Sequence, residues 1–126
     1  MKNPNDNFVK ERLRSIIFSL RGIWLLITTE SSIKVQVFFA VLITIAGFYF
    51  DISTTEWLVQ TLAIGLVLVA ESLNTGVEKL SDFVHADYHE KIGFIKDVCA
   101  GSAGIAAIIT LILGCIIYIP KVALLF

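Results

Sequence analysis

The sequence predicts an all-α integral membrane protein: an amphipathic surface helix followed by three membrane-spanning helices, in a single membrane domain covering residues 1–126. First, 56% of the residues are hydrophobic and the mean hydropathy is +0.82. A soluble domain this small buries only about 60–70% of its unfolded surface, too little to hide so much apolar area. Second, the apolar residues gather in long segments. Third, lysine and arginine are concentrated in some connections and missing from others.

The three spanning helices are expected at residues 33–50, 55–82 and 96–119. The third contains the run from Val98 to Ile119, which carries no formal charge and satisfies the roughly 17–25 residues that a span needs. The apolar parts of the first two, Val35–Phe50 and Trp57–Ala70, are shorter. Their polar flanks must therefore lie in the membrane boundary, or the bilayer must thin locally.

Residues 8–29 are expected to form an amphipathic helix that lies on the membrane surface. Apolar side chains recur there at helical spacing, at Val9, Leu13, Ile16, Ile17, Leu20, Ile23, Trp24 and Ile27. Lys10, Arg14 and Arg21 fall elsewhere on the helical wheel, where they can face anionic headgroups.

The distribution of basic residues predicts the orientation of the chain. Basic residues are frequent before the first span and recur between the second and third, at Lys79, Lys91 and Lys96. The connection at residues 51–56 has none, and the C-terminal tail has only Lys121. Positive residues favour the cytoplasmic side, so the N-terminus is expected inside and the C-terminus outside. The N-terminal segment does not have the pattern of a removable signal peptide, and a net charge of -1 gives no reason to expect a nucleic-acid partner.

A polar stripe on the middle span is the clearest indication of function. Glu71 lies about 21 Å along that helix from Trp57, inside or at the inner edge of a hydrocarbon layer about 30 Å thick. Asn74, Glu78 and Asp82 continue the same face at helical spacing. A carboxylate at this depth is costly, which makes it a functional-site candidate. The structural alternative is a protonated Glu71 bonded to a neighbouring helix, with Glu78 and Asp82 at a solvated helix end.

A second polar cluster precedes the third span, and one acidic residue precedes the first. The cluster consists of Asp87, Tyr88, His89, Lys96 and Asp97. These residues are also compatible with ordinary charge at a membrane boundary, although a cation there could hold phosphate oxygens. Glu30 is expected on the same side of the membrane, and by itself it could simply be solvated.

Several carboxylates and an amide on one side of the membrane suit Mg²⁺, which often binds through one or two carboxylates together with substrate phosphates. A zinc site at His85 and His89 lacks a clear third ligand. The two cysteines, Cys99 and Cys115, would be about 24 Å apart on one helix, too far for a disulfide. No P-loop or protein-kinase motif is present, which excludes the familiar nucleotide-binding folds.

The polar stripe has a specific sequence pattern. The run ESLNTGVEKLSD from Glu71 to Asp82, followed by Tyr88-His89 and Lys96-Asp97, resembles the small prokaryotic diacylglycerol kinase family, which includes the undecaprenol kinases of Gram-positive bacteria. The segments 21–24 and 29–30 also resemble the family, so the likeness covers nearly the whole chain. The pair Asn74-Thr75 and the segment 119–121 look more like the undecaprenol kinase branch.

The resemblance implies a homotrimer in the prokaryotic cytoplasmic membrane, with active sites between neighbouring subunits that transfer the ATP γ-phosphoryl group to a lipid hydroxyl. Glu71 would be the catalytic base, and Glu30 and Glu78 would hold Mg²⁺. The ATP side would be lined by Asn74, Asp87, Tyr88, His89, Lys96 and Asp97. Arg14 is a further candidate near the nucleotide, and the roles of His85 and Asp82 stay open.

The sequence departs from the family pattern at a few positions. Ser31, Ser32 and Val35 replace residues that are more polar or larger in the family, which bears on lipid selectivity. Gly76 replaces a usual alanine, a change that is consistent with close helix contact. Diacylglycerol and undecaprenol both present a primary hydroxyl, so the choice of lipid stays open.

Two other functions are compatible with parts of this pattern. A small proton-coupled transporter needs one buried acid such as Glu71, but it has no use for Asn74, Glu78, Lys96 and Asp97. A non-catalytic membrane scaffold needs none of these residues.

Overall fold

The computed structural model describes residues 3–126 and contains four α-helices: α1 Phe8–Thr29, α2 Ser31–Tyr49, α3 Thr54–Val84 and α4 Glu90–Ala123. The predicted all-helical fold is therefore confirmed. Helices α2, α3 and α4 are long and apolar enough to cross a membrane, which confirms the expectation of three spanning helices.

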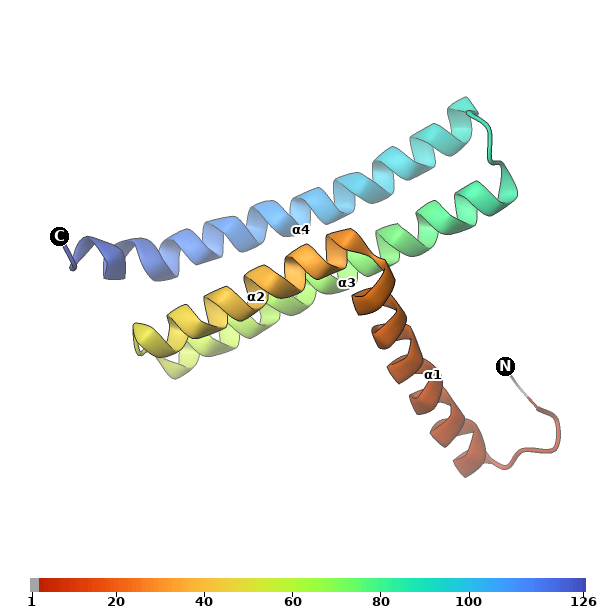
Figure 1. Ribbon diagram of the computed structural model, residues 1–126, viewed down its shortest axis with the longest axis horizontal. Helices are drawn as coiled ribbons and strands as arrows, with labels where there is room; N and C mark the ends of the chain where they lie inside the picture. Colours follow the sequence, from red (N-terminus) through yellow and green to blue (C-terminus); the bar gives the residue numbers. More distant parts are fainter. Residues whose placement is uncertain (1–2) are drawn as a thin grey trace.

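The three long helices lie side by side, and α1 leaves them at an angle (Figure 1). Helices α3 and α4 form an antiparallel hairpin that continues past the α1–α2 corner, so its closed end has no α2 beside it (Figure 1). Helix α2 packs on α3, while α1 meets α2 at the corner and has no buried residue. The first described residues lie at the end of α1 away from the corner, and the C-terminus lies at the end of the bundle opposite the α3–α4 connection (Figure 1).

Local capping explains where the helices begin. Asn7 starts α1 by accepting a hydrogen bond from the backbone N–H of Lys10 at 2.9 Å. Ser53 and Glu56 form a reciprocal capping box at the start of α3, with bonds of 3.0 and 3.2 Å. His89 caps α4, because its Nδ1 accepts from the backbone N–H of Lys91 at 3.1 Å. Helix α4 therefore begins at Glu90, in polar sequence well before the apolar run.

Three side-chain contacts fix the register between α3 and α4. Lys121 pairs with Glu56 at 2.8 Å, Thr110 donates to the carbonyl of Ala63 at 3.3 Å, and Lys96 pairs with Asp82 at 2.6 Å. In this antiparallel register the segment 71–78 of α3 lies opposite the small-residue segment 99–107 of α4. Small side chains there permit close helix approach.

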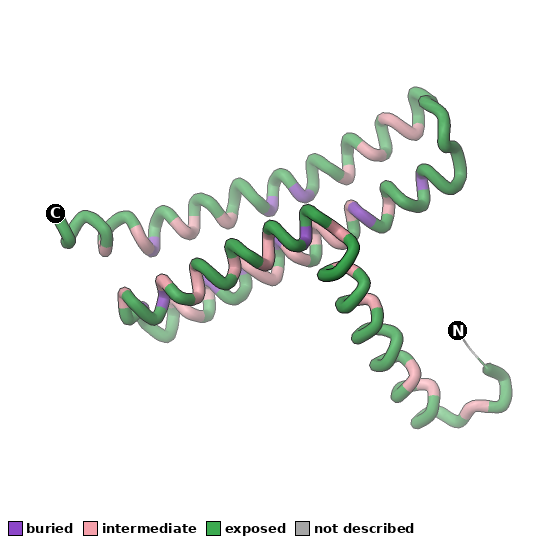
Figure 2. Tube along the Cα trace, viewed as in Figure 1, coloured by how far each residue is buried: buried purple, intermediate pink, exposed green. Residues whose placement is uncertain are grey.

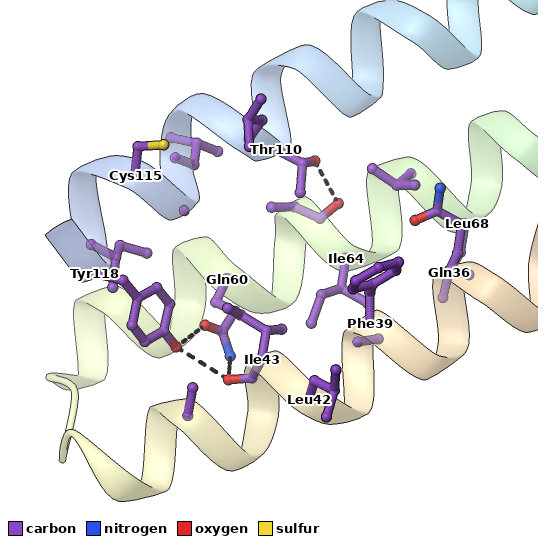
Figure 3. Close-up of a pocket in the computed structure, with 18 of the residues that line it drawn as sticks. Gln36, Phe39, Leu42, Ile43, Gln60, Ile64, Leu68, Thr110, Cys115 and Tyr118 are labelled. Carbon is purple, nitrogen blue, oxygen red and sulfur yellow. Dashed lines mark hydrogen bonds between the residues drawn. The ribbon is translucent and has the colours of Figure 1, made fainter. Parts of the chain in front are cut away.

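At the other end of the bundle, one backbone carbonyl ties three helices together (Figure 3). The carbonyl of Ile43 in α2 accepts from Gln60 Nε2 at 3.3 Å and from the Tyr118 hydroxyl at 3.2 Å. The Tyr118 hydroxyl also donates to Gln60 Oε1. These groups line one end of an apolar cavity of about 600 Å³ between α2, α3 and α4. Polar groups in apolar surroundings are costly unless they are bonded, so this network fixes the relative positions of the helices.

Most of the described residues are exposed (Figure 2), and many of the exposed residues are large and apolar. Phe38, Leu62 and Leu111 are examples, one from each of the three long helices. Exposed apolar area on this scale marks a surface covered by lipid or by other subunits. The bundle is therefore built to be solvated by a membrane.

Candidate functional site

The residues proposed from the sequence lie in three segments. Glu30 is at the corner between α1 and α2, and Glu71, Asn74 and Glu78 are on α3. The remaining candidates lie in the α3–α4 connection and the first turns of α4, at Asp87, Tyr88, His89, Lys96 and Asp97. All three segments belong to the half of the molecule that contains the α1–α2 corner and the closed end of the hairpin (Figure 1).

The polar stripe lies on one uninterrupted helix. Because α3 is continuous, Glu71, Asn74 and Glu78 share a face at spacings of three and four residues. Glu71 and Asn74 are half-buried, and Glu78 is exposed. The side-chain oxygen Oδ1 of Asn74 is buried and has no hydrogen-bond partner among the described residues. A buried acceptor left unpaired costs about 1–3 kcal/mol, so a donor from a ligand or a second subunit that reached this oxygen would bind favourably.

Glu30 connects two helices and contacts a third. It is the single residue between α1 and α2, with an extended backbone that ends one helix and begins the next. One carboxylate oxygen, Oε1, lies 3.2 Å from the ammonium of Lys79 on α3 and accepts from the Thr29 hydroxyl at 3.1 Å. The hydrogen bond from Lys79 is the main reason that the pKa of Glu30 lies below its ordinary value, against the opposing effect of partial burial. Glu30 is therefore held as a carboxylate beside α3.

Lys96 is a second lysine that forms an ion pair near the polar stripe. Its ammonium donates to Asp82 Oδ1 at 2.6 Å and also lies within electrostatic range of the Glu78 carboxylate. Lys96 on α4 is therefore near Glu78, whereas Lys79 does not share the Glu78 face of α3 and pairs with Glu30 instead. The structure thus forms two ion pairs, Glu30–Lys79 and Asp82–Lys96, with Glu78 near the second; we call these five residues the charged cluster.

The sequence reasoning left Asp82 without a role and did not propose Lys79 at all. Asp82 had a usable signal, because it continues the polar face of Glu78 one helical turn later. Lys79 had none, because its contact with Glu30 depends on how the α1–α2 corner packs against α3.

The α3–α4 connection presents exposed side chains. His85 Nδ1 bonds to the carbonyl oxygen of Asp87 at 2.7 Å, and the rings of His85 and His89 meet edge to face with centroids 5.3 Å apart. The ring of Tyr88 is exposed and lies against Gly93, where an added Cβ would be 3.3 Å from it. Asp97 is exposed on the first turns of α4. In residues 3–126 the structure brings neither the Asp87 nor the Asp97 carboxylate into contact with another predicted site residue.

Arg14 lies away from this cluster. It forms an ion pair with Asp6 near the start of α1. Glu30 is at the other end of that helix, about 24 Å away along its axis. Within one subunit the structure therefore does not bring Arg14 to the site.

The donor set at the site fits Mg²⁺ only in part. Among the described residues, no group of three or more histidine, cysteine or acidic side chains is arranged to hold a metal ion. Mg²⁺ does not require such a group, because it commonly binds one or two carboxylates and completes its shell with phosphates and water. Glu30 lies beside Lys79 and Glu78 lies near Lys96, and each could supply one of the carboxylates that this mode of binding needs.

Comparison with known proteins gives a consistent result over most of the chain. The family model described as prokaryotic diacylglycerol kinase matches residues 17–118. The undecaprenol kinase of Bacillus subtilis (strain 168) is 31% identical over 115 residues, covering 91% of this chain and 94% of that protein. The diacylglycerol kinase of Synechocystis is 29% identical over 114 residues, covering 89% of this chain and 65% of that protein. The diacylglycerol kinase of Escherichia coli (strain K12) is 26% identical over 98 residues, 78% of each chain.

Proposed function

The chain belongs to the prokaryotic diacylglycerol kinase family, a family of membrane lipid kinases, and from this premise we propose the reaction that it catalyses. The γ-phosphoryl group of ATP is transferred to the hydroxyl of a membrane lipid alcohol at the cytoplasmic boundary, with Mg²⁺ as cofactor. The acceptor is diacylglycerol or undecaprenol, the two lipids named by the relatives.

The observation that carries this proposal is the contact between Glu30 and Lys79. It joins the α1–α2 corner to α3 at the residue that follows Glu78, so the two proposed carboxylate ligands come from two elements that are in contact. A proton-coupled transporter needs one buried acid and has no use for a second acid such as Glu30, nor for Lys79 and Lys96. A nucleotide with its cation uses all of them, because phosphoryl transfer depends on positioning and on neutralising charge.

Glu71 is proposed as the general base. Of the four stripe residues it lies nearest the apolar part of α3, and it is half-buried, which suits contact with the hydroxyl of a lipid. As the hydroxyl oxygen bonds to the γ-phosphorus, the bond from that phosphorus to the β–γ bridging oxygen breaks and ADP leaves. The hydroxyl proton passes to the Glu71 carboxylate. A positioned base of this kind contributes about 10²–10⁴-fold to the rate.

Glu30 and Glu78 are proposed as the Mg²⁺ ligands. When bound, the cation neutralises charge on the β- and γ-phosphate oxygens. On the protein side, Lys96 is held by Asp82 at a fixed place beside Glu78, from which its ammonium can face phosphate oxygens.

The rest of the ATP side is proposed to be Asn74, Asp87, Tyr88, His89 and Asp97. The buried, unpaired Oδ1 of Asn74 supports a ligand contact, since a donor from the nucleotide would satisfy it. The exposed ring of Tyr88 offers an apolar face to a base. His89 keeps its Nδ1 on the backbone of Lys91, which leaves Nε2 free to face the nucleotide.

We also propose a homotrimer with the N-terminus and the α3–α4 connection inside the cell. The exposed apolar faces of α2, α3 and α4 support an assembly that covers part of them. Helix α1, with no buried residue and many exposed apolar side chains, is proposed to lie in the membrane surface. Its angle to the bundle is compatible with that position (Figure 1).

The test is a lipid phosphorylation assay. The full chain is placed in lipid nanodiscs with Mg²⁺, labelled ATP, and either diacylglycerol or undecaprenol. We expect label on at least one lipid, and its loss in Glu71→Gln. Glu90→Gln is the matched control, because Glu90 is an exposed acid in the first turn of α4. No lipid labelling by the wild-type protein, or full labelling by Glu71→Gln, would contradict the proposal, and proton-driven efflux without labelling would support the transporter.

A further inference from the structure

We propose that Lys79 is a positioning residue for Glu30. Its ammonium holds the α1–α2 corner against α3, at a place that it must yield when the magnesium nucleotide binds. This inference rests on the proposed function, because it takes Glu30 as a metal ligand.

The two carboxylate oxygens of Glu30 have different surroundings. Oε1 receives both the Lys79 ammonium, at 3.2 Å, and the Thr29 hydroxyl, at 3.1 Å. Within residues 3–126, Oε2 receives no hydrogen bond. The Glu30 side chain is 19% exposed, while that of Lys79 is 68% exposed. A shielded carboxylate is thus paired with a cation that has open solvent beside it.

The Glu30–Lys79 ion pair contributes to the stability of the α1–α2 corner because few other contacts hold this corner in place. Glu30 is the only residue between α1 and α2, and α1 has no buried residue. Helix α2 begins its buried packing at Ile33, one turn later. The ion pair with Lys79 therefore links the corner itself to α3, and its loss should loosen the last turn of α1 and the first turn of α2.

The same contact competes with a metal ion. A divalent cation on Glu30 would stand next to an ammonium 3.2 Å from that carboxylate, and like charges at such distances repel. Lys79 is exposed, on a flexible stem, so it can turn into solvent. Lys96 differs, because its bond to Asp82 keeps it in place whether or not a cation is present. Lys79 is therefore the cation that leaves and Lys96 the one that stays.

The first test measures the corner without metal. Wild-type protein, Lys79→Gln and Lys79→Arg are compared in nanodiscs by amide hydrogen exchange of peptides covering residues 26–36. We expect exchange at least about threefold faster in Lys79→Gln, because one stabilising ion pair is removed. We expect protection to return in Lys79→Arg, which keeps the charge. Lys91→Gln is the matched control, since it removes a lysine that makes no side-chain ion pair among the described residues.

The second test measures cation binding directly. Mn²⁺ alone is titrated into the same nanodiscs and followed by electron paramagnetic resonance. We expect Lys79→Gln to bind Mn²⁺ about three- to fivefold more tightly than wild type, because a competing, solvent-screened charge is gone. The gain should vanish in the double variant Glu30→Gln/Lys79→Gln. Unchanged exchange, or unchanged or weaker Mn²⁺ binding, in Lys79→Gln would overturn the inference.

Lipid phosphorylation by the wild-type nanodiscs separates the two proposals. If the wild type labels lipid while Lys79→Gln shows neither change, the role of Lys79 is wrong and the kinase function stands. If the wild type neither labels lipid nor binds Mn²⁺, the proposed function itself fails.

Discussion

The ammonium of Lys96 on α4 lies 2.6 Å from Oδ1 of Asp82 on α3, which makes this pair the polar contact between the two long helices nearest their connection. The pair is partly exposed, so its energy is modest. Its effect on geometry is larger. It aims a flexible lysine across the hairpin toward Glu78, where a phosphate could meet it.

We therefore expect Asp82→Asn to weaken ATP use more than stability. Without its carboxylate partner, Lys96 should lose its fixed position, and the KM for ATP should rise about three- to tenfold, as for loss of one partly exposed charged contact. Steady-state kinetics at saturating lipid give this value. If Asp82 acts only by positioning Lys96, then Lys96→Met and the double variant Asp82→Asn/Lys96→Met should show nearly the same KM for ATP. Additive effects on this KM would show that the two residues act separately.

Replacing Glu71 by glutamine should affect the chemical step. We expect kcat to fall at least about 100-fold, because the amide cannot accept the hydroxyl proton. The thermal midpoint and nucleotide affinity should stay near those of the wild type, since the shape of the side chain is retained. Nucleotide affinity can be measured with a fluorescent ATP analogue. A comparable loss of that affinity would indicate a binding role for Glu71 instead.

Asn74 offers a test that separates function from stability. Its buried Oδ1 has no partner in the described structure, so Asn74→Leu should leave stability unchanged or raise it by up to about 1 kcal/mol. Activity should nevertheless fall at least about tenfold if the nucleotide uses this oxygen. Thermal unfolding in nanodiscs and the phosphorylation assay provide the two values. A stable and fully active variant would remove Asn74 from the site.

Substitutions at the end of the bundle away from the α3–α4 connection should change the stability of the protein but not its catalytic rate. Tyr118→Phe removes the hydroxyl that donates to Gln60 and to the carbonyl of Ile43, at an expected cost of about 1–2 kcal/mol. Gly47→Ala should also destabilise, because its Cβ would lie 2.6 Å from the Trp57 ring. Tyr49→Phe is the control, since Tyr49 is exposed at the same end. A selective loss of kcat in Tyr118→Phe at normal stability would contradict this division.

The helices could be predicted from the sequence because hydropathy and helical spacing are local properties. The face shared by Glu71, Asn74 and Glu78 follows from one continuous helix. The limits of the spans, 33–50, 55–82 and 96–119, remain predictions. The helix that includes the last of them begins earlier, at Glu90, because a histidine cap rather than hydropathy sets its start.

The pairing of charges could not be predicted in the same way. The contacts of Lys79 with Glu30 and of Lys96 with Asp82 join residues that are distant along the chain. They depend on the angle of the α1–α2 corner and on the register of the α3–α4 hairpin. Local periodicity of the sequence predicts neither of these. The unpaired oxygen of Asn74 is likewise a property of packing, since the sequence shows the amide but not the neighbours that shield it.

Joining α1 to α2 through a single residue fixes the rotational phase of one helix relative to the other. One extra residue in the last turn of α1 would turn everything upstream in that helix by about 100° around its axis. In the membrane-surface position proposed for α1, its apolar side chains would then turn away from the bilayer, even though no residue of the charged cluster had been replaced. Homologous sequences should therefore tolerate substitutions at this joint far better than insertions or deletions.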